Sequence, residues 1–242
     1  MLEAGADPNA RGKWDYTPLH EAAMWNSNIG VVSALLEAGA DPEARNHPGN
    51  TPLHLASHPA AVSVLLDAGA DPQARDQGGS IPLHTVARYS RSAAAISLLV
   101  GAGADPNARD EYGRTPLREA AGLNDSPGVV VALLGAGADP GKEDRNGSTP
   151  LEYAVGSKQN PAVIYALVAA GADPNQRIPG GRTVLHQAVR GQTNPAVIRA
   201  LLDAGADASL PDESGKLPWD SVKYNLELKG TDIYRTLRQA RK

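Results

Sequence analysis

Four histidines occupy the same place in a repeated pattern and could, by residue type, bind a metal. Each lies three residues after a Thr or after the residue that replaces it, at His20, His54, His84 and His186. Imidazole nitrogen is a common zinc ligand, so a ladder of metal sites is conceivable. Stacked helical layers, however, lie about 8–10 Å apart, too far for two imidazoles to reach one zinc ion at about 2 Å each. We therefore predict a structural role for these histidines and no metal site.

The other chemical motifs are incomplete. The segment His20-Glu-Ala-Ala-Met24 begins like a zinc-protease motif, but Met24 stands where the second histidine is required. The chain has no Cys, which excludes disulfides, thiolate metal sites and cysteine nucleophiles. The glycine-containing segments 78–79 and 101–103 are too short to cradle a phosphate, and they fit turns and helix ends better. We expect a protein that is not an enzyme and that needs no cofactor.

An arginine recurs at a fixed interval before most of the predicted turns, at Arg11, Arg45, Arg75, Arg109 and Arg177. Such a row of guanidinium groups could bind an anionic partner. An Asp directly follows two of these arginines, however, and reduces the local positive charge. We interpret the row as a solvated, charged stripe.

The histidines and arginines belong to one unit that repeats along the chain. The triplet Gly-Ala-Asp begins at Gly5, Gly39, Gly69, Gly103, Gly137, Gly171 and Gly205, with intervals of 34 residues and a single interval of 30. A second marker, Thr-Pro-Leu-His or a degraded form of it, begins ten residues after each Asp, at Thr17, Thr51, Ile81, Thr115, Thr149, Thr183 and Leu217. Repeats of this length predict a solenoid.

Each marker has a local physical reason. Gly after an apolar helical run adopts the left-handed conformation that ends a helix, and the following Asp-Pro prevents continuation. Another Gly, two residues before the second marker, suits a turn that needs positive φ, and Asp15 takes its place in the first unit. Thr then caps a new helix in which Pro is the first residue. Each unit should therefore contain a turn and two helices.

This order of turn, Thr-Pro-Leu-His helix, second helix and Gly-Ala-Asp resembles the ankyrin repeat over essentially all 242 residues. The resemblance implies an all-α repeat solenoid, in which antiparallel helix pairs stack and β-hairpin fingers project from them. It also implies that the motif histidine forms hydrogen bonds between repeats. The second complete unit is four residues shorter than its neighbours, and we place this shortening in the loop between its two helices.

We interpret residues 1–242 as a single ankyrin repeat domain. A partial repeat and finger would occupy residues 1–16, and complete repeats would follow at 17–50, 51–80, 81–114, 115–148, 149–182 and 183–216. The marker decays to Leu-Pro-Trp-Asp at 217–220, so residues 217–242 are expected to form a capping repeat with a polar outer side. The chain begins inside a repeat, which predicts further sequence upstream.

Composition narrows the classes of partner. The formal net charge is −4 and the isoelectric point about 5.9, with both signs interspersed, so no nucleic-acid-binding face is indicated. No apolar run approaches the roughly 20 residues that cross a bilayer, and we expect no membrane partner. We expect a cytoplasmic protein, while the start inside a repeat leaves a periplasmic or secreted location open. We expect a monomer, with self-association through the bare N-terminal face as the alternative.

Surface recognition is the function that remains. In ankyrin domains the finger tips and the exposed end of the inner helix usually bind a protein partner, and the resemblance implies the same for the matching positions here. The predicted protein-binding residues are Trp14, Tyr16, Met24, Trp25, His47, Arg88, Tyr89, Tyr112 and Arg114. Trp, Tyr and Arg often dominate the energy of an interface. Alternatively, Met24 and Trp25 pack beneath the interhelix loop or cover the surface left by a missing repeat.

We therefore expect a non-catalytic module that binds a protein partner, and that could inhibit or neutralise an enzyme by covering its site. The binding residues concentrate in the first four units, and the last two repeats would be scaffold. The alternative is an ankyrin fragment of a longer protein, whose upstream part carries catalysis or membrane attachment. An enzyme in its own right has no nucleophile–base pair, metal cluster or cofactor loop in its support.

Overall fold

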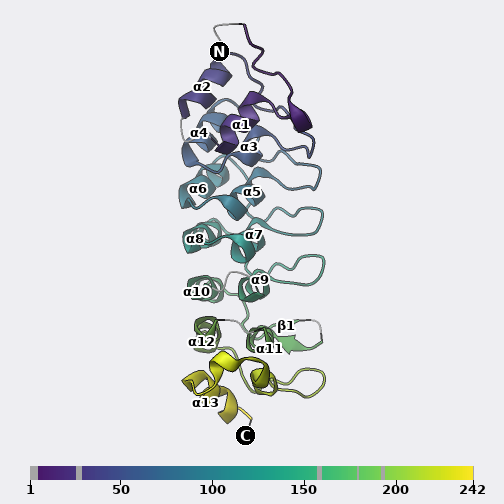
Figure 1. Ribbon diagram of the computed structural model, residues 1–242, viewed down its shortest axis with the longest axis vertical. Coiled ribbons are helices and arrows are strands. Elements are labelled where there is room, and N and C mark those ends of the chain that lie inside the picture. Colours follow the sequence, from purple (N-terminus) through teal and green to yellow (C-terminus); the bar gives the residue numbers. More distant parts are fainter. Residues whose placement is uncertain (1–4, 26–28, 157–159, 179, 192–193, 242) are drawn as a thin grey trace.

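The computed structural model describes residues 5–25, 29–156, 160–178, 180–191 and 194–241. These residues form an elongated stack of helix pairs, with the outer helices in one column and the inner helices in a second (Figure 1). The turns project from the inner column, on the side away from the outer helices. The fold is the all-α repeat solenoid expected from the sequence.

The two columns follow the two helices of each repeat. The inner helices are α1 (Pro18–Trp25), α3 (Pro52–Leu55), α5 (Pro82–Tyr89), α7 (Pro116–Leu123), α9 (Pro150–Gly156) and α11 (Val184–Arg190). The outer helices are α2 (Ile29–Glu37), α4 (Pro59–Asp67), α6 (Ala93–Gly101), α8 (Pro127–Gly135), α10 (Pro161–Ala169) and α12 (Pro195–Asp203). Each helix packs against its own partner and against the next helix of its column.

The core is a continuous seam between the columns. The Leu of each Thr-Pro-Leu marker is at most 1% exposed, at Leu19, Leu53, Leu83, Leu117, Leu151 and Leu185. The outer helices bury β-branched residues against them, at Val32, Val62, Ile96, Val130, Ile164 and Ile198. Burying a side chain of this size stabilises the fold by about 1.5–3 kcal/mol. Because each repeat contributes only one thin layer, the stability arises from the stacking of neighbours.

The motif histidines connect successive repeats. The His20 ring interacts through Nδ1 with the Thr17 hydroxyl at 2.9 Å, and through Nε2 with the carbonyl oxygen of Asn50 in the next repeat at 2.9 Å. The corresponding Nε2–carbonyl contacts measure 3.0–3.1 Å at His54, His84 and His186. These bonds confirm the structural role expected for the four histidines. Burial lowers the pKa of His20, His54 and His84, which favours neutral rings.

The arginines of the row are exposed, as a charged stripe at the surface requires, and they also connect the repeats. One nitrogen of each guanidinium donates to a backbone carbonyl oxygen of the next repeat. The pairs are Arg11 with Arg45 (3.0 Å), Arg45 with Arg75 (2.6 Å), Arg75 with Arg109 (3.0 Å), Arg109 with Glu143 (2.7 Å) and Arg177 with Pro211 (2.8 Å). The row therefore connects each of these five fingers to the next one along the chain, while Glu143 takes the place of the arginine in the finger that lies between Arg109 and Arg177.

The shortened second repeat lacks a helical turn. Helix α3 has four residues, whereas α5 of the next repeat has eight. The connections from inner to outer helix, residues 56–58 and 90–92, are equally long. The expectation that the shortening trims the interhelix loop was therefore wrong. The loop keeps its length because it must still bring the chain back to the outer column, and the inner helix ends early instead.

The fingers are mostly tight turns, and the C-terminal end departs from the repeat pattern. Among the described fingers, the antiparallel ladder is the one between strands β1 (Arg177–Ile178) and β2 (Arg182–Thr183).

The last repeat consists of the 3-10 helices η3 (Pro218–Tyr224) and η4 (Leu226–Leu228) and of α13 (Asp232–Gln239), which packs on α12. None of the described helices combines the length and apolar character needed to traverse a bilayer.

Candidate protein-binding surface

The first finger presents Trp14 on an unusual backbone. The 3-10 turn η2 (Lys13–Asp15) holds both Trp14 and Asp15 at φ 59°. This is the left-handed region that glycine favours and bulky side chains rarely adopt. Asp15 thus takes the place of the turn glycine as expected, and Trp14 shares its conformation. Non-glycine residues held there cost about 1–3 kcal/mol each and are frequent at functional sites. The Trp14 side chain is 60% exposed.

The next finger supports Trp14. The backbone N–H of His47 donates to the Trp14 carbonyl oxygen at 2.8 Å, and the two rings lie 5.6 Å apart. His47 is exposed, so the pair forms one aromatic surface across two finger tips.

Tyr16 was expected to be an exposed residue of the finger tip, and the structure differs. It is half-buried, with its ring 5.6 Å from that of His20, because the chain already turns back onto α1 at this residue.

Three predicted residues surround a hollow of about 450 Å³ on the inner side of the stack. Residues 54–57, the end of the short α3 and the start of the connection after it, line the hollow on one side. Met24 and Trp25 line it from the end of α1, and Tyr89 lines it from the end of α5. The hollow exists because α3 ends one turn before its neighbours. Trp25 is 77% and Tyr89 64% exposed, and Met24 is half-buried. The alternative that Trp25 is buried beneath the interhelix loop is therefore wrong.

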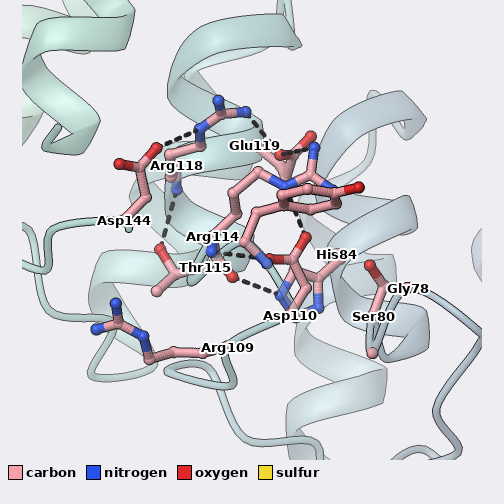
Figure 2. A network of polar contacts seen from close by, with 12 residues as sticks. Gly78, Ser80, His84, Arg109, Asp110, Arg114, Thr115, Arg118, Glu119 and Asp144 are labelled. Atoms are coloured by element: carbon pink, nitrogen blue, oxygen red, sulfur yellow. Dashed lines mark hydrogen bonds and ion pairs between the residues drawn. The ribbon is translucent and has the colours of Figure 1, made fainter. Parts of the chain in front are cut away.

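Beside Tyr89, three arginines converge on one buried carboxylate, Glu119. Figure 2 shows two of them, Arg114 and Arg118. Glu119 on α7 is 3% exposed. Its Oε1 accepts a hydrogen bond from Arg118 at 2.7 Å and lies 3.6 Å from Nη1 of Arg114, while its Oε2 lies 3.7 Å from Nη1 of Arg88 on α5. Glu119 thus joins the inner helices of the third and fourth repeats, and its charge is surrounded by guanidinium groups.

Two further acids complete this network on the finger side. Arg114 Nε donates to Asp110 Oδ2 at 2.6 Å, and Arg118 Nε lies 3.9 Å from Asp144 Oδ2. The Tyr153 hydroxyl donates to the same Asp144 oxygen at 3.0 Å. Three arginines are thus matched by three carboxylates, so this part of the surface is rigid and close to neutral.

The predicted residues Tyr112, Arg114 and Arg88 differ in how far the network engages them. Tyr112 is 60% exposed at its finger tip, with the Arg114 guanidinium 4.8 Å from its ring centre. Arg114 itself is largely engaged by the network, and Arg88 is paired with Glu119. The guanidinium of Arg88 also lies 5.2 Å from the Tyr89 ring centre. Both arginines therefore position exposed tyrosines and are only partly available to a partner.

Arg88 and Arg114 were predicted from the sequence as surface residues, but the other members of the network, Asp110, Arg118, Glu119 and Asp144, were missed, although a signal was present. Arg118 stands at the position of the motif histidine in the fourth repeat, and Glu152 stands there in the fifth. Burial raises the pKa of Glu152, and its Oε2 atom is buried without a hydrogen-bond partner among the described residues. A departure from histidine at this position thus marks a charged side chain on the inner helix, Arg118 in the fourth repeat and Glu152 in the fifth.

Comparisons with known proteins agree with the fold. A family model described as ankyrin repeats in three copies matches residues 1–76 and 119–212, and one described as ankyrin repeats in many copies matches residues 65–120. No curated protein is significantly similar in sequence. Among solved structures, the ankyrin repeat domain of Bcl-3, described as a unique member of the IkappaB protein family, is similar with a TM-score of 0.71 and 28% identity, over 95% of this chain and 100% of that chain.

Proposed function

Because the chain belongs to the ankyrin repeat family, whose members are generally protein–protein interaction modules, we propose that it binds a protein partner through its first four repeats. The contact surface comprises the finger tips and the inner-helix side. The observation that carries this proposal is the hollow between Trp25 and Tyr89. It offers two exposed aromatic walls and an apolar floor on a rigid scaffold.

The energetics favour binding at this hollow. An aromatic side chain can bury about 150–250 Å², and truncation of such an anchor typically costs 2 kcal/mol or more of binding energy. The aromatic rings of Trp14 and Tyr112 lie on finger tips, where they can contact a partner seated in the hollow. Because the charge network already holds the neighbouring Arg88 and Arg114, ordering these two side chains adds little cost on binding.

We further propose that the bound partner is an enzyme whose site this surface covers. The support is the rigid, preformed surface, which suits stoichiometric blocking and needs no catalytic group of its own. Titration of the captured partner with the purified chain would test this role. Loss of the partner's activity at a one-to-one ratio is expected, and full activity in the saturated complex would contradict it.

The binding surface can be tested by capture with a matched control. The wild-type chain and the variant Trp25→Ala/Tyr89→Ala would be used to isolate partners from native extract, after circular dichroism has verified the fold. The control Val131→Ala/Tyr165→Ala removes two exposed apolar side chains from outer helices α8 and α10. We expect a partner that the wild type and the control retain and the first variant loses. Equal retention by both variants would place the site elsewhere.

A further inference from the structure

A second hollow, of about 470 Å³, opens between the sixth repeat and the C-terminal capping repeat. Basic side chains from four different segments line it: Arg182, Arg190, Lys216 and Lys223. They come from strand β2, the end of α11, the last finger and helix η3. The buried His186 also lines it. This is the part of the molecule that the sequence assigned to scaffold alone.

These four cations differ from those of the charge network because none forms an ion pair within the described part of the chain. Nζ of Lys223 lies 5.0 Å from the centre of the Tyr224 ring. Two acids also line the hollow, and both already accept backbone hydrogen bonds. Asp212 accepts from Ser214 and Lys216 at 2.8 and 2.9 Å, and Asp220 accepts from Leu217 at 2.9 Å.

The hollow is positive in a chain that is negative overall. Residues 1–181 carry 13 basic and 20 acidic side chains, whereas residues 182–242 carry ten basic and seven acidic ones. Within the hollow, four cations face two carboxylates that are committed to local turns. A concave surface of one sign concentrates the electric field and attracts ligands of the opposite charge.

We propose that this hollow is a second binding site, which takes an acidic peptide segment. Guanidinium groups bind carboxylates through paired, charge-assisted hydrogen bonds, and here Arg182 and Arg190 supply two of them. Lys216 and Lys223 add charge on the capping side, and the exposed ring of Tyr224 offers an apolar contact. The proposal does not rest on the hollow between Trp25 and Tyr89.

The size of the hollow favours a peptide over a single small anion. Its volume of about 470 Å³ is far larger than the ~30 Å³ that one water molecule occupies in the liquid, and a phosphate ion is only a few times larger than water. The cations also come from separate segments around the hollow. They therefore suit several carboxylates spaced along a chain.

The test is calorimetric titration of the whole chain at low ionic strength, where charge contacts are weakly screened. The probes are an end-blocked hexaglutamate, the isosteric hexaglutamine and inorganic phosphate. We expect hexaglutamate to bind with a one-to-one ratio and hexaglutamine not to bind. The variant Arg190→Ala/Lys223→Ala should weaken hexaglutamate binding at least about tenfold, since it removes two charged hydrogen-bond donors.

A matched control separates the hollow from general positive charge. Arg235→Ala/Arg238→Ala removes the same charge from exposed positions of α13 that do not line the hollow, and it should change the affinity by less than about twofold. Equal losses in both variants, or no binding of hexaglutamate to the wild type, would overturn the proposal. Tighter binding of phosphate than of hexaglutamate, abolished by Arg190→Ala/Lys223→Ala, would also overturn it. The variant Trp25→Ala/Tyr89→Ala should bind hexaglutamate normally, so that failure of one proposed site leaves the other untouched.

Discussion

The second and fourth repeats share a backbone motif but differ in what they present on the inner side. The second keeps the motif histidine, His54, and loses a turn of its inner helix, so that its surface is a recessed apolar floor. The fourth keeps a full-length helix and replaces the histidine by Arg118, which pairs with the buried Glu119. Length variation in one repeat thus makes a hollow, while substitution at one motif position in the other makes a charged network.

The two repeats therefore contribute different features to the proposed binding surface. A hollow between Trp25 and Tyr89 is useful only if its walls stay apart, and the wall that carries Tyr89 is tied to the fourth repeat through Arg88 and Glu119. The apolar site therefore depends on a charged one that lies outside it. A change that removes the special feature of the second repeat should therefore weaken binding, and a change that removes the charge network of the fourth should lower stability.

The largest effect is expected from making the second repeat full length. Insertion of four helix-forming residues after Leu55 would extend α3 to the length of α5 and fill the hollow. We expect partner affinity to fall at least about hundredfold, as for the loss of an interface hot spot, with no loss of stability. Titration of the captured partner and urea unfolding would measure the two quantities. Unchanged affinity in the folded insertion variant would show that the hollow is not used.

The next effect concerns the fourth repeat. Glu119→Ala leaves three guanidinium groups without their shared counter-charge, and should lower the free energy of unfolding by about 3 kcal/mol, the lower part of the range for broken buried ion pairs. The lower value applies because the arginines remain partly exposed. Urea unfolding measures the change. The exposed Glu111→Ala provides the control, with an expected change within about 0.5 kcal/mol, and similar values for both would contradict the network.

The histidine-bearing repeats should respond to pH. Burial lowers the pKa of His20, His54 and His84 below the ordinary value of 6.5, so the unfolded chain binds protons before the folded chain does. Stability should therefore be complete above pH 6.5 and fall as the pH decreases below it. Thermal unfolding between pH 7.5 and 5.5 would show the decrease, and His54→Gln should reduce its slope. A flat profile would contradict neutral, buried rings.

The smallest effect is expected in the fifth repeat, where Glu152 replaces the histidine. Its pKa is raised by burial, so the charged form present at neutral pH destabilises the fold, and this penalty disappears when the pH falls below about 4.5. Glu152→Gln should raise the free energy of unfolding at pH 7 by about 1 kcal/mol. The same change at the exposed Glu37 on α2 should be neutral, and a destabilised Glu152→Gln would show that the carboxylate is needed.

The fold could be predicted because its determinants are local and repeated. Thr, Pro, Leu and Gly act on their own turn of chain, and seven occurrences of the markers fix the period. Exposed anchors such as Trp14 and Trp25 were predicted as exposed because their positions within the repeat are known. Their role in binding stays a prediction.

The features that could not be predicted from the sequence depend on contacts between separate segments of the chain. The ion pair of Arg88 with Glu119 joins residues on different inner helices, and no local pattern marks it. The hollow needs the relative lengths of three helices, which a four-residue deletion alone does not assign to helix or loop. Tyr16 was predicted as exposed because its neighbour Trp14 lies on the finger, yet one turn of backbone brings it against His20.

The arginine row and the histidine column point in one direction along the chain. Every guanidinium of the row and every motif histidine reaches a carbonyl oxygen that lies 26 to 34 residues further toward the C-terminus. A repeat leaving the ribosome can therefore form these contacts only after its successor has been made. Synthesis of the next repeat at roughly 5–20 residues per second takes a few seconds. During this time the newest repeat lacks its contacts to a C-terminal neighbour and is the part of the chain most accessible to a chaperone.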